Sequence, residues 1–215
     1  MLIKDRCRKS VTAPFHISEG ASSYVYKLSR CRKTSGLYPD RQIELREGKL
    51  IIMSPSDSVS GEVGARFSML LSTWVYTHNL GRILDSSTGF RLPNGDLLSP
   101  DVSYVSRERL KQNPRTYLSV VPELIVEIKS SRDRLRELEE KITLFLDQGV
   151  QVGLLIDPDT HTVRVYRSSG LSKDAESGEA ILQGTTLHNG DTLTIPDLFP
   201  GWEIPITSLW PTVYE

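Results

Sequence analysis

The chain has 215 residues, of which 38% are hydrophobic and 25% charged. This composition excludes full-length disorder, collagen and a coiled coil, and the length favours one domain with its own core. No apolar run approaches the ~18 residues that a membrane-spanning helix needs, so we expect no membrane partner.

The net charge of −1 is unevenly distributed. Residues 1–40 contain eight Lys and Arg against three Asp and Glu, which is +5 and leaves −6 for the remaining chain. We therefore expect a basic, irregular extension over 1–40 and a single domain over 41–215. A basic segment on an acidic body attracts polyanions such as nucleic acid, and a solvated tail explains the pattern equally well.

Both cysteines, Cys7 and Cys31, lie in this extension. The first residues, MLIKDRCRKS, lack the apolar stretch of a secretory signal. We therefore expect a cytoplasmic protein with free thiols, because disulfides are rare in that compartment. Nothing in the sequence supports a disulfide between the two cysteines.

The first elements of the domain are a hairpin and a helix. Residues 43–53 are largely apolar around Glu47-Gly48, which predicts a hairpin that turns there. Apolar residues then recur at three- and four-residue spacing over 58–79 and predict a helix. Short strands are expected after it, at 82–84, 88–92, 101–105 and 124–129.

A second helix has the clearest periodicity. Its apolar stripe contains Leu135, Leu138, Ile142 and Phe145. Ser130, Ser131 and Asp133 are the expected caps of its start, and Gly149 is expected to end it.

The last part of the chain is expected to be β-rich. Residues 152–156 form a continuously apolar run that predicts a central strand, and 162–166 alternate. We expect a polar loop over 168–179 and a further strand at 192–195. The whole order predicts a mixed sheet flanked by a few helices, an α/β or α+β core.

Two charged residues occur on the strand at 124–129. Because residues alternate between the two faces of a strand, Glu127 and Lys129 share a face. Buried charges need partners or a metal, and a Glu127–Lys129 ion pair on a half-solvated sheet is one explanation.

Asp101 offers a second explanation, because it opens a strand 26 residues before Glu127. Two carboxylates, a backbone carbonyl such as that of Ile128, and waters make a site for Mg²⁺ or Mn²⁺. Lys129 could then polarise a water molecule or stabilise charge that grows on a phosphate. These are the parts that metal-assisted phosphodiester hydrolysis requires.

Pro100-Asp101 followed by Glu127-Ile128-Lys129 matches the PD-(D/E)XK nuclease signature. Other segments occur with it in one order: Asp85-Ser-Ser-Thr-Gly-Phe90, Leu92-Pro-Asn-Gly95, Ser99-Pro-Asp-Val-Ser103, Pro122-Glu-Leu-Ile-Val-Glu-Ile-Lys-Ser130, Lys141 and Gly149-Val-Gln-Val-Gly-Leu-Leu-Ile-Asp-Pro158. Together they resemble the bacterial Uma-two family of restriction-endonuclease-like proteins. The resemblance covers about Arg41 to Trp210 and excludes residues 1–40.

The resemblance implies a restriction-endonuclease-like mixed sheet with an N-terminal hairpin and a β-rich C-terminal edge. It implies that Asp101 and Glu127 hold Mg²⁺ or Mn²⁺ and that Lys129 assists the attacking water. Glu62 on the first helix is a candidate for a further acid, although a solvated acid near a helix start explains it as well. Lys141 could contact a phosphate or be a solvated lysine.

Two functions remain open. The first is a metal-dependent endonuclease with DNA as its partner, for which double-strand cutting would suit a homodimer. The second is a catalytically silent nuclease fold that acts as a nucleic-acid- or protein-binding module, which the acidic body favours because it repels phosphates. RNA is not distinguished from DNA. The sequence lacks a Gly-rich phosphate loop, so we expect no organic cofactor.

Overall fold

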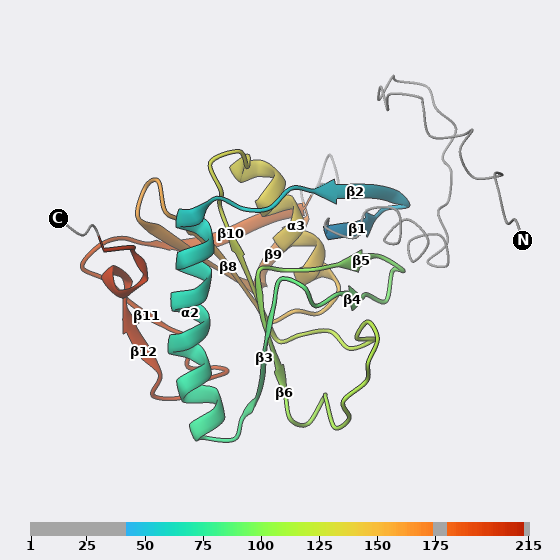
Figure 1. The fold of residues 1–215 in the computed structure, drawn as a ribbon, viewed down its shortest axis with the longest axis horizontal. Coiled ribbons are helices and arrows are strands. Elements are labelled where there is room, and N and C mark those ends of the chain that lie inside the picture. Colours follow the sequence, from blue (N-terminus) through green and yellow to red (C-terminus); the bar gives the residue numbers. More distant parts are fainter. Residues whose placement is uncertain (1–41, 174–179, 213–215) are drawn as a thin grey trace, which may run out of the picture.

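The computed structural model describes residues 42–173 and 180–212 (Figure 1). The expected basic extension, with Cys7 and Cys31, lies outside the described residues. The elements follow in the order β1 (Gln42–Arg46), β2 (Lys49–Met53), α2 (Ser58–Thr77), β3 (Gly81–Asp85), β4 (Phe90–Arg91), β5 (Leu97–Leu98), β6 (Val102–Ser106), β7 (Leu124–Ile128), α3 (Leu135–Asp147), β8 (Val152–Asp157), β9 (Thr162–Lys173), β10 (Ala180–Leu187), β11 (Thr192–Thr194), β12 (Glu203–Pro205) and the 3-10 helix η1 (Ile206–Leu209).

The central layer is a six-stranded mixed sheet in the order β10-β9-β8-β7-β6-β3. The β7–β8 pair is parallel, and the other neighbours are antiparallel. A smaller sheet in the order β2-β1-β5-β4 contains the N-terminal hairpin, and β11 pairs with β12. The prediction of a mixed sheet flanked by helices is confirmed.

The two long helices pack against opposite faces of the large sheet (Figure 1). Val126 and Ile128 of β7 join the cluster that contains Phe67 of α2. Ile125 points the other way, into the cluster that contains Phe145 of α3. Strand β7 is therefore buried on both faces, and a charged residue on it lies beneath a helix.

Local signals set the ends of the first elements, and the turn of the hairpin lies where the sequence predicts it. Glu47 and Gly48 have φ of 50° and 76°, and they turn the hairpin between β1 and β2. Asp57 caps α2, because its Oδ1 accepts a hydrogen bond of 3.0 Å from the backbone N–H of Ser60. Asn79, with φ of 53°, follows the C-terminus of the helix.

The predicted cap of the second helix is wrong. Helix α3 begins at Leu135, and Arg134 before it makes no capping hydrogen bond through its side chain. Asp133 accepts hydrogen bonds from the backbone and hydroxyl of Ser130 instead. The backbone N–H of Ser131 donates to Asp57, so one local turn and one tertiary contact engage the residues that the local pattern assigns to the cap.

The predicted polar loop over 168–179 is wrong for its first part. Residues 168–173 continue β9, which pairs with β10, whereas 174–179 lie outside the described residues. Beyond Arg167, β9 has left its pairing with the buried strand β8 and pairs only with β10, so this part needs no continuous apolar face and its polar sequence does not reveal a strand. In the part of the chain that the structure describes, no helix is long and apolar enough to cross a membrane.

Candidate active site

Asp101 lies where the chain enters β6, and it is anchored to the neighbouring strand. Its Oδ2 accepts a hydrogen bond of 2.7 Å from the backbone N–H of Ile128, which leaves Oδ1 available for another ligand. Burial raises the pKa of Asp101, although the charge of Lys141 and the Ile128 hydrogen bond act in the opposite direction.

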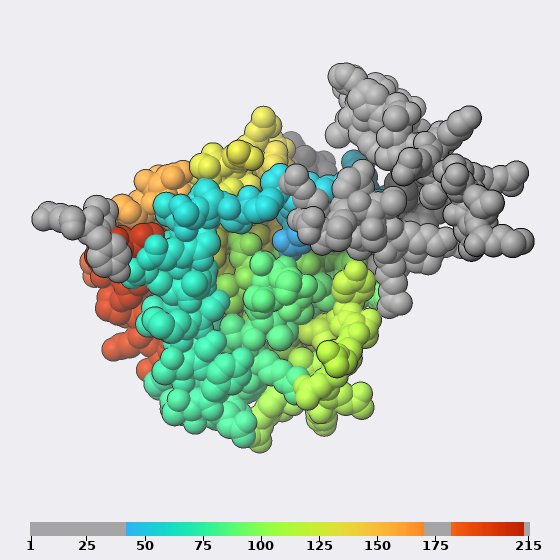
Figure 2. All heavy atoms as spheres, viewed as in Figure 1, coloured from blue at the N-terminus to red at the C-terminus, as the bar shows by residue number. Residues whose placement is uncertain are grey.

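A hollow of about 490 Å³ opens in front of Asp101. We call it the acidic hollow; it is lined by Ser56, Ser60, Gly61, Gly64, Ala65, Ser68, Asp85, Ser86, Asp101 and Ile128. In the space-filling view, the cyan atoms of α2 adjoin the green atoms of the chain that follows, and both segments contribute to this lining (Figure 2). The small residues on the first turns of α2 leave room beside the two carboxylates.

Asp85 is a second carboxylate in this hollow, and the sequence reasoning missed it. It ends β3 opposite Val102 of β6, one residue from Asp101. Its Oδ1 accepts hydrogen bonds from the backbone and hydroxyl of Ser87, at 3.1 and 2.6 Å. The available signal was an acid at a strand end, directly before Ser86-Ser87-Thr88.

Glu127 is buried on the α3 face of β7, as the alternation of the strand predicts. Lys141 Nζ lies 2.9 Å from Oε1 and 3.2 Å from Oε2 of this carboxylate. Only the contact with Oε2 has the geometry of a hydrogen bond. The buried Oε1 lies close to Nζ but accepts no hydrogen bond from any residue that the structure describes. Burial, together with the nearby carboxylates of Asp101 and Glu44, raises the pKa of Glu127 to about 8 against the opposing effect of Lys141.

Lys141 reaches this carboxylate from α3 and also contacts the hairpin. Its Nζ lies 2.9 Å from Glu44 Oε1 and donates to the carbonyl of Ser99 at 2.9 Å. Burial alone would lower the pKa of Lys141, but the charges of Glu127, Glu44 and Asp101 outweigh it and raise the pKa. Lys141 is therefore a buried ammonium group with three acceptors.

Glu44 on β1 is a further residue that the sequence reasoning missed. Its Oε1 accepts a hydrogen bond of 2.8 Å from the backbone N–H of Ser99, whose carbonyl accepts from Lys141. Both polar groups of the Ser99 backbone are thus held by buried charged side chains, two residues before Asp101. The signal in the sequence was an acid between the apolar residues Ile43 and Leu45 of the predicted hairpin.

Lys129 has a different partner from Glu127. Its Nζ forms an ion pair with Asp159 in the turn after β8, and this hydrogen bond raises the pKa of Lys129. The Lys129 side chain is 14% exposed, and that of Asp159 is 65% exposed. The explanation of the two charges as a Glu127–Lys129 ion pair is therefore wrong, because each residue has a different partner.

Glu62 lies outside this group. It forms an ion pair of 2.8 Å with Arg66, four residues later on α2, and its side chain is 46% exposed. It does not line the acidic hollow. Within residues 42–173 and 180–212, no three His, Cys, Asp or Glu side chains converge closely enough to hold a metal by themselves.

The donor set around Asp101 and Glu127 nevertheless fits a hard divalent cation. Both carboxylates have raised pKa values because burial is not balanced by positive charge, and Glu127 Oε1 lacks an aligned donor. Mg²⁺ typically uses one or two protein carboxylates and completes its six ligands with water and substrate phosphates. Two carboxylates are therefore sufficient for such an ion.

A mixed sheet with one helix on each face, an acid at the entry of β6 and another near the end of β7 is a restriction-endonuclease-like fold. The chain belongs to the family described as "Uma2: Putative restriction endonuclease", whose sequence model matches residues 29–207. The match begins within the expected basic extension and covers most of the chain.

The structure is similar to a crystal structure described as "a putative nuclease belonging to DUF820" from Anabaena variabilis ATCC 29413. The two share 20% sequence identity with a TM-score of 0.62, over 78% of this chain and 88% of the other. This likeness establishes the fold. No curated protein matches the sequence.

Proposed function

We propose that the protein is a divalent-metal-dependent endonuclease that hydrolyses DNA phosphodiester bonds. One observation carries the proposal: Asp101 lines the acidic hollow while it is anchored to β7, the strand that bears Glu127 and that Lys129 directly follows. The family of restriction endonucleases to which the chain belongs supports the same reaction class.

In this proposal Asp101, Glu127 and the backbone carbonyl of Ile128 would hold Mg²⁺ or Mn²⁺. The cation would supply Lewis-acid stabilisation of the phosphate oxygens and would lower the pKa of the attacking water. Asp101 contributes the oxygen that is not engaged by Ile128. Glu127 contributes Oε1, which has no aligned donor among the described side chains.

In this proposal Lys129 assists the attacking water after its ammonium group leaves Asp159 for the substrate. Its present partner, Asp159, is mostly exposed, and ion pairs with an exposed partner contribute only ~0–1 kcal/mol. The ammonium group can therefore leave Asp159 for the substrate at low cost. Lys141 acts differently: it is a positioning residue, because it holds Glu127 and the Ser99 carbonyl and is too deeply buried to contact a phosphate.

The second candidate is a catalytically silent nuclease fold that binds nucleic acid or protein. The engagement of both lysines favours it, since Lys129 pairs with Asp159 and Lys141 with Glu44 and Glu127. Metal binding without cleavage would support this candidate.

A cleavage assay separates the two candidates. Supercoiled plasmid and short single- and double-stranded DNA and RNA would be incubated with Mg²⁺, Mn²⁺ or EDTA. Wild type would be compared with Asp101→Asn, Lys129→Ala and the exposed control Asp147→Asn. We expect metal-dependent cutting that falls at least ~100-fold in the first two variants, because outer-shell changes alone cost 10–100-fold. The control should cut like wild type.

Equal cutting by all four proteins would indicate a contaminant and contradict the enzyme. The second candidate, the catalytically silent fold, would be favoured if no cutting is seen while calorimetry detects Mn²⁺ binding that Asp101→Asn abolishes. A linear plasmid product would show that both strands are cut, and sedimentation of the same sample would then test for a homodimer.

A further inference from the structure

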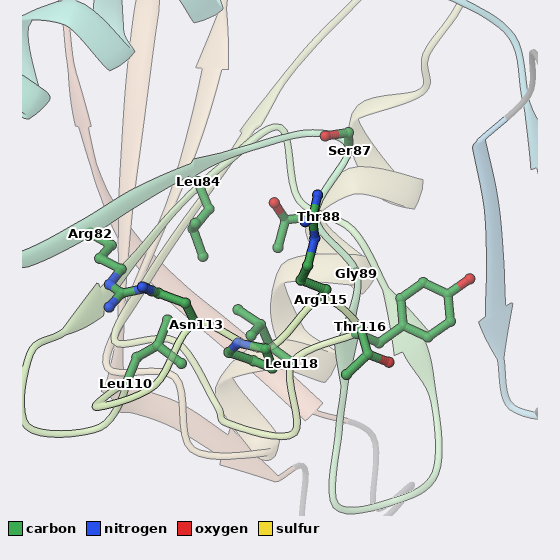
Figure 3. A pocket seen from close by; sticks show the side chains of 12 residues that line it. Arg82, Leu84, Ser87, Thr88, Gly89, Leu110, Asn113, Arg115, Thr116 and Leu118 are labelled. Atoms are coloured by element: carbon green, nitrogen blue, oxygen red, sulfur yellow. The ribbon is translucent and has the colours of Figure 1, made fainter.

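A second hollow of about 780 Å³ lies at the β3 edge of the large sheet, outside the proposed active site. We call it the arginine hollow; it is lined by Arg82, Leu84, Ser87, Thr88, Gly89, Leu110, Asn113, Pro114, Arg115, Thr116, Tyr117 and Leu118. In the close-up, Arg82 lies beside Asn113, Arg115 lies beside Thr88, and the leucines lie between the two arginines (Figure 3).

The charge of this hollow is positive, although the body of the chain is acidic. Two guanidinium groups and no carboxylate belong to its lining. Arg82 donates to the amide oxygen of Asn113, which leaves its charge uncompensated. Arg115 is exposed and makes no ion pair with any residue that the structure describes. Such a pair of arginines favours an anionic ligand, above all a phosphate.

The floor of the hollow is apolar and partly aromatic. Leu110 and Leu118 belong to the core cluster beneath α3, and Tyr117 packs on the side of the hairpin cluster. Gly89 makes room for Tyr117, because a Cβ at this glycine would lie 2.8 Å from the tyrosine ring. Aromatic rings of this kind stack on unpaired bases, and the volume lies within the range of small-ligand sites.

The two hollows share one turn of the chain. Asp85 and Ser86 line the acidic hollow, and the next residues, Ser87 and Thr88, line the arginine hollow. A ligand that passes over this turn therefore reaches from Asp101 to the two arginines. A nucleic acid strand combines the required features, since it offers a phosphate and a flat base at each step.

We propose that the arginine hollow binds an unpaired nucleotide of the substrate strand. Its phosphate lies between Arg82 and Arg115, and its base lies against Tyr117 and the leucine floor. The direction of the strand toward Asp101 rests on the proposed function, but the binding itself requires neither metal nor cleavage.

The test measures binding in EDTA, where metal-dependent cutting is absent. The probe is a 12-nucleotide single-stranded DNA with a 5′-fluorescein, followed by anisotropy at two KCl concentrations. Wild type is compared with Arg115→Gln, Arg82→Gln and the control Arg167→Gln. Arg167 is a matched surface arginine on β9, which strands β8, β7 and β6 separate from β3.

We expect Arg115→Gln to weaken binding about tenfold, because a hydrogen bond to a charged group is lost. The slope of log affinity against log salt should also become shallower by about 1, as for one lost phosphate contact. Arg82→Gln should behave similarly, and its thermal unfolding verifies that it is folded. A fully paired duplex should show less dependence on Arg115. If Arg115→Gln and Arg82→Gln bind like Arg167→Gln, the proposal is overturned.

Two further arms identify the source of the phosphate. Calorimetry with dAMP and with inorganic phosphate measures the affinity of each for wild type and Arg115→Gln. Weaker binding than that of the oligonucleotide supports a strand as the ligand. Arg115-dependent binding of dAMP or phosphate that is as tight as that of the oligonucleotide would contradict a strand and indicate a free nucleotide or phosphate site.

The outcome is independent of the cleavage assay. Asp101→Asn should bind the oligonucleotide at least as well as wild type, because it removes a carboxylate and leaves both arginines in place. Oligonucleotide binding that depends on Arg115 supports the proposed nucleotide site even where no DNA is cut. If Arg115→Gln shows metal-dependent cutting with unchanged KM and Kd, the endonuclease proposal stands and the proposed nucleotide site in the arginine hollow is overturned.

Discussion

The acidic hollow and the arginine hollow lie on two sides of one short turn and differ in almost every property. The first contains Asp85 and Asp101 beside the small residues of α2. The buried ion pairs of Lys141 with Glu44 and Glu127 stabilise the strands that carry it. The second has Arg82 and Arg115 above an apolar floor and lies between β3 and the loop over 110–118.

The difference matters because phosphodiester cleavage needs both kinds of surface. A cation site requires concentrated negative charge, which repels the substrate, so a separate positive surface must hold the strand. The net charge of the whole chain conceals this arrangement. Local charge, set by the fold, therefore says more about the ligand than the excess of acids outside the first forty residues.

The largest expected effect concerns the buried ion pairs that Lys141 forms with Glu44 and Glu127 next to the acidic hollow. Lys141→Met leaves Glu44 and Glu127 buried without their shared cation, which should cost about 3–5 kcal/mol of the free energy of unfolding. Urea unfolding measures the change. Arg136→Met on the same helix is the control, because its side chain is 88% exposed.

A triple variant makes this test specific. Replacement of Glu44 and Glu127 by Gln together with Lys141→Met removes all three charges and should recover more than half of the lost stability. A loss below ~1 kcal/mol in Lys141→Met alone would mean that the network is hydrated, and the contrast between the two hollows would then lose its structural basis.

A smaller effect is expected at Asp57, which caps α2 next to residues that line the acidic hollow. Asp57 joins the start of α2 to the loop after β7, since its carboxylate accepts hydrogen bonds from Ser60 and from Ser131. Asp57→Ala should cost about 1–2 kcal/mol at pH 7, the range for loss of a helix cap. Asp57→Asn keeps one acceptor and should cost less. Equal unfolding midpoints for wild type and Asp57→Ala would contradict the tether.

The same residue predicts a dependence on pH. The backbone hydrogen bonds of Ser60 and Ser131 lower the pKa of Asp57 in the folded state. Its contribution to stability is therefore present above the unfolded pKa of ~3.9 and is lost as the pH falls through the lower folded value. The difference between wild type and Asp57→Ala should shrink in urea unfolding at pH 3 compared with pH 7. A difference that grows on acidification would have the wrong sign.

The smallest expected effect concerns the turn between the hollows. Asp85→Asn removes one negative charge that faces an incoming strand, and in EDTA it should tighten oligonucleotide binding about twofold, as expected for one exposed charge. With Mg²⁺ the gain should disappear if the carboxylate contributes to cation binding. Weaker binding in EDTA would indicate that the Asp85 hydrogen bonds to Ser87 hold the arginine hollow in shape.

Several elements of the fold followed from local signals. The hairpin needs positive φ at Glu47 and Gly48, and the periodicity over 58–79 can be buried only as a helix. The prediction failed where partners are distant in sequence. Strand β5 has two residues and forms only because it lies between β1 and β4, and the expected caps of α3 bond with other groups.

By itself, the sequence determined which face of β7 Glu127 occupies, because strand alternation is local. Only the tertiary structure decided that Lys141, and not Lys129, lies beside Glu127, and that Glu44 shares this lysine across 97 positions of the chain. The position of Asp85 beside Asp101 depended on the pairing of β3 with β6. Contacts of this kind arise from the packing of whole elements, and a one-dimensional pattern does not contain them.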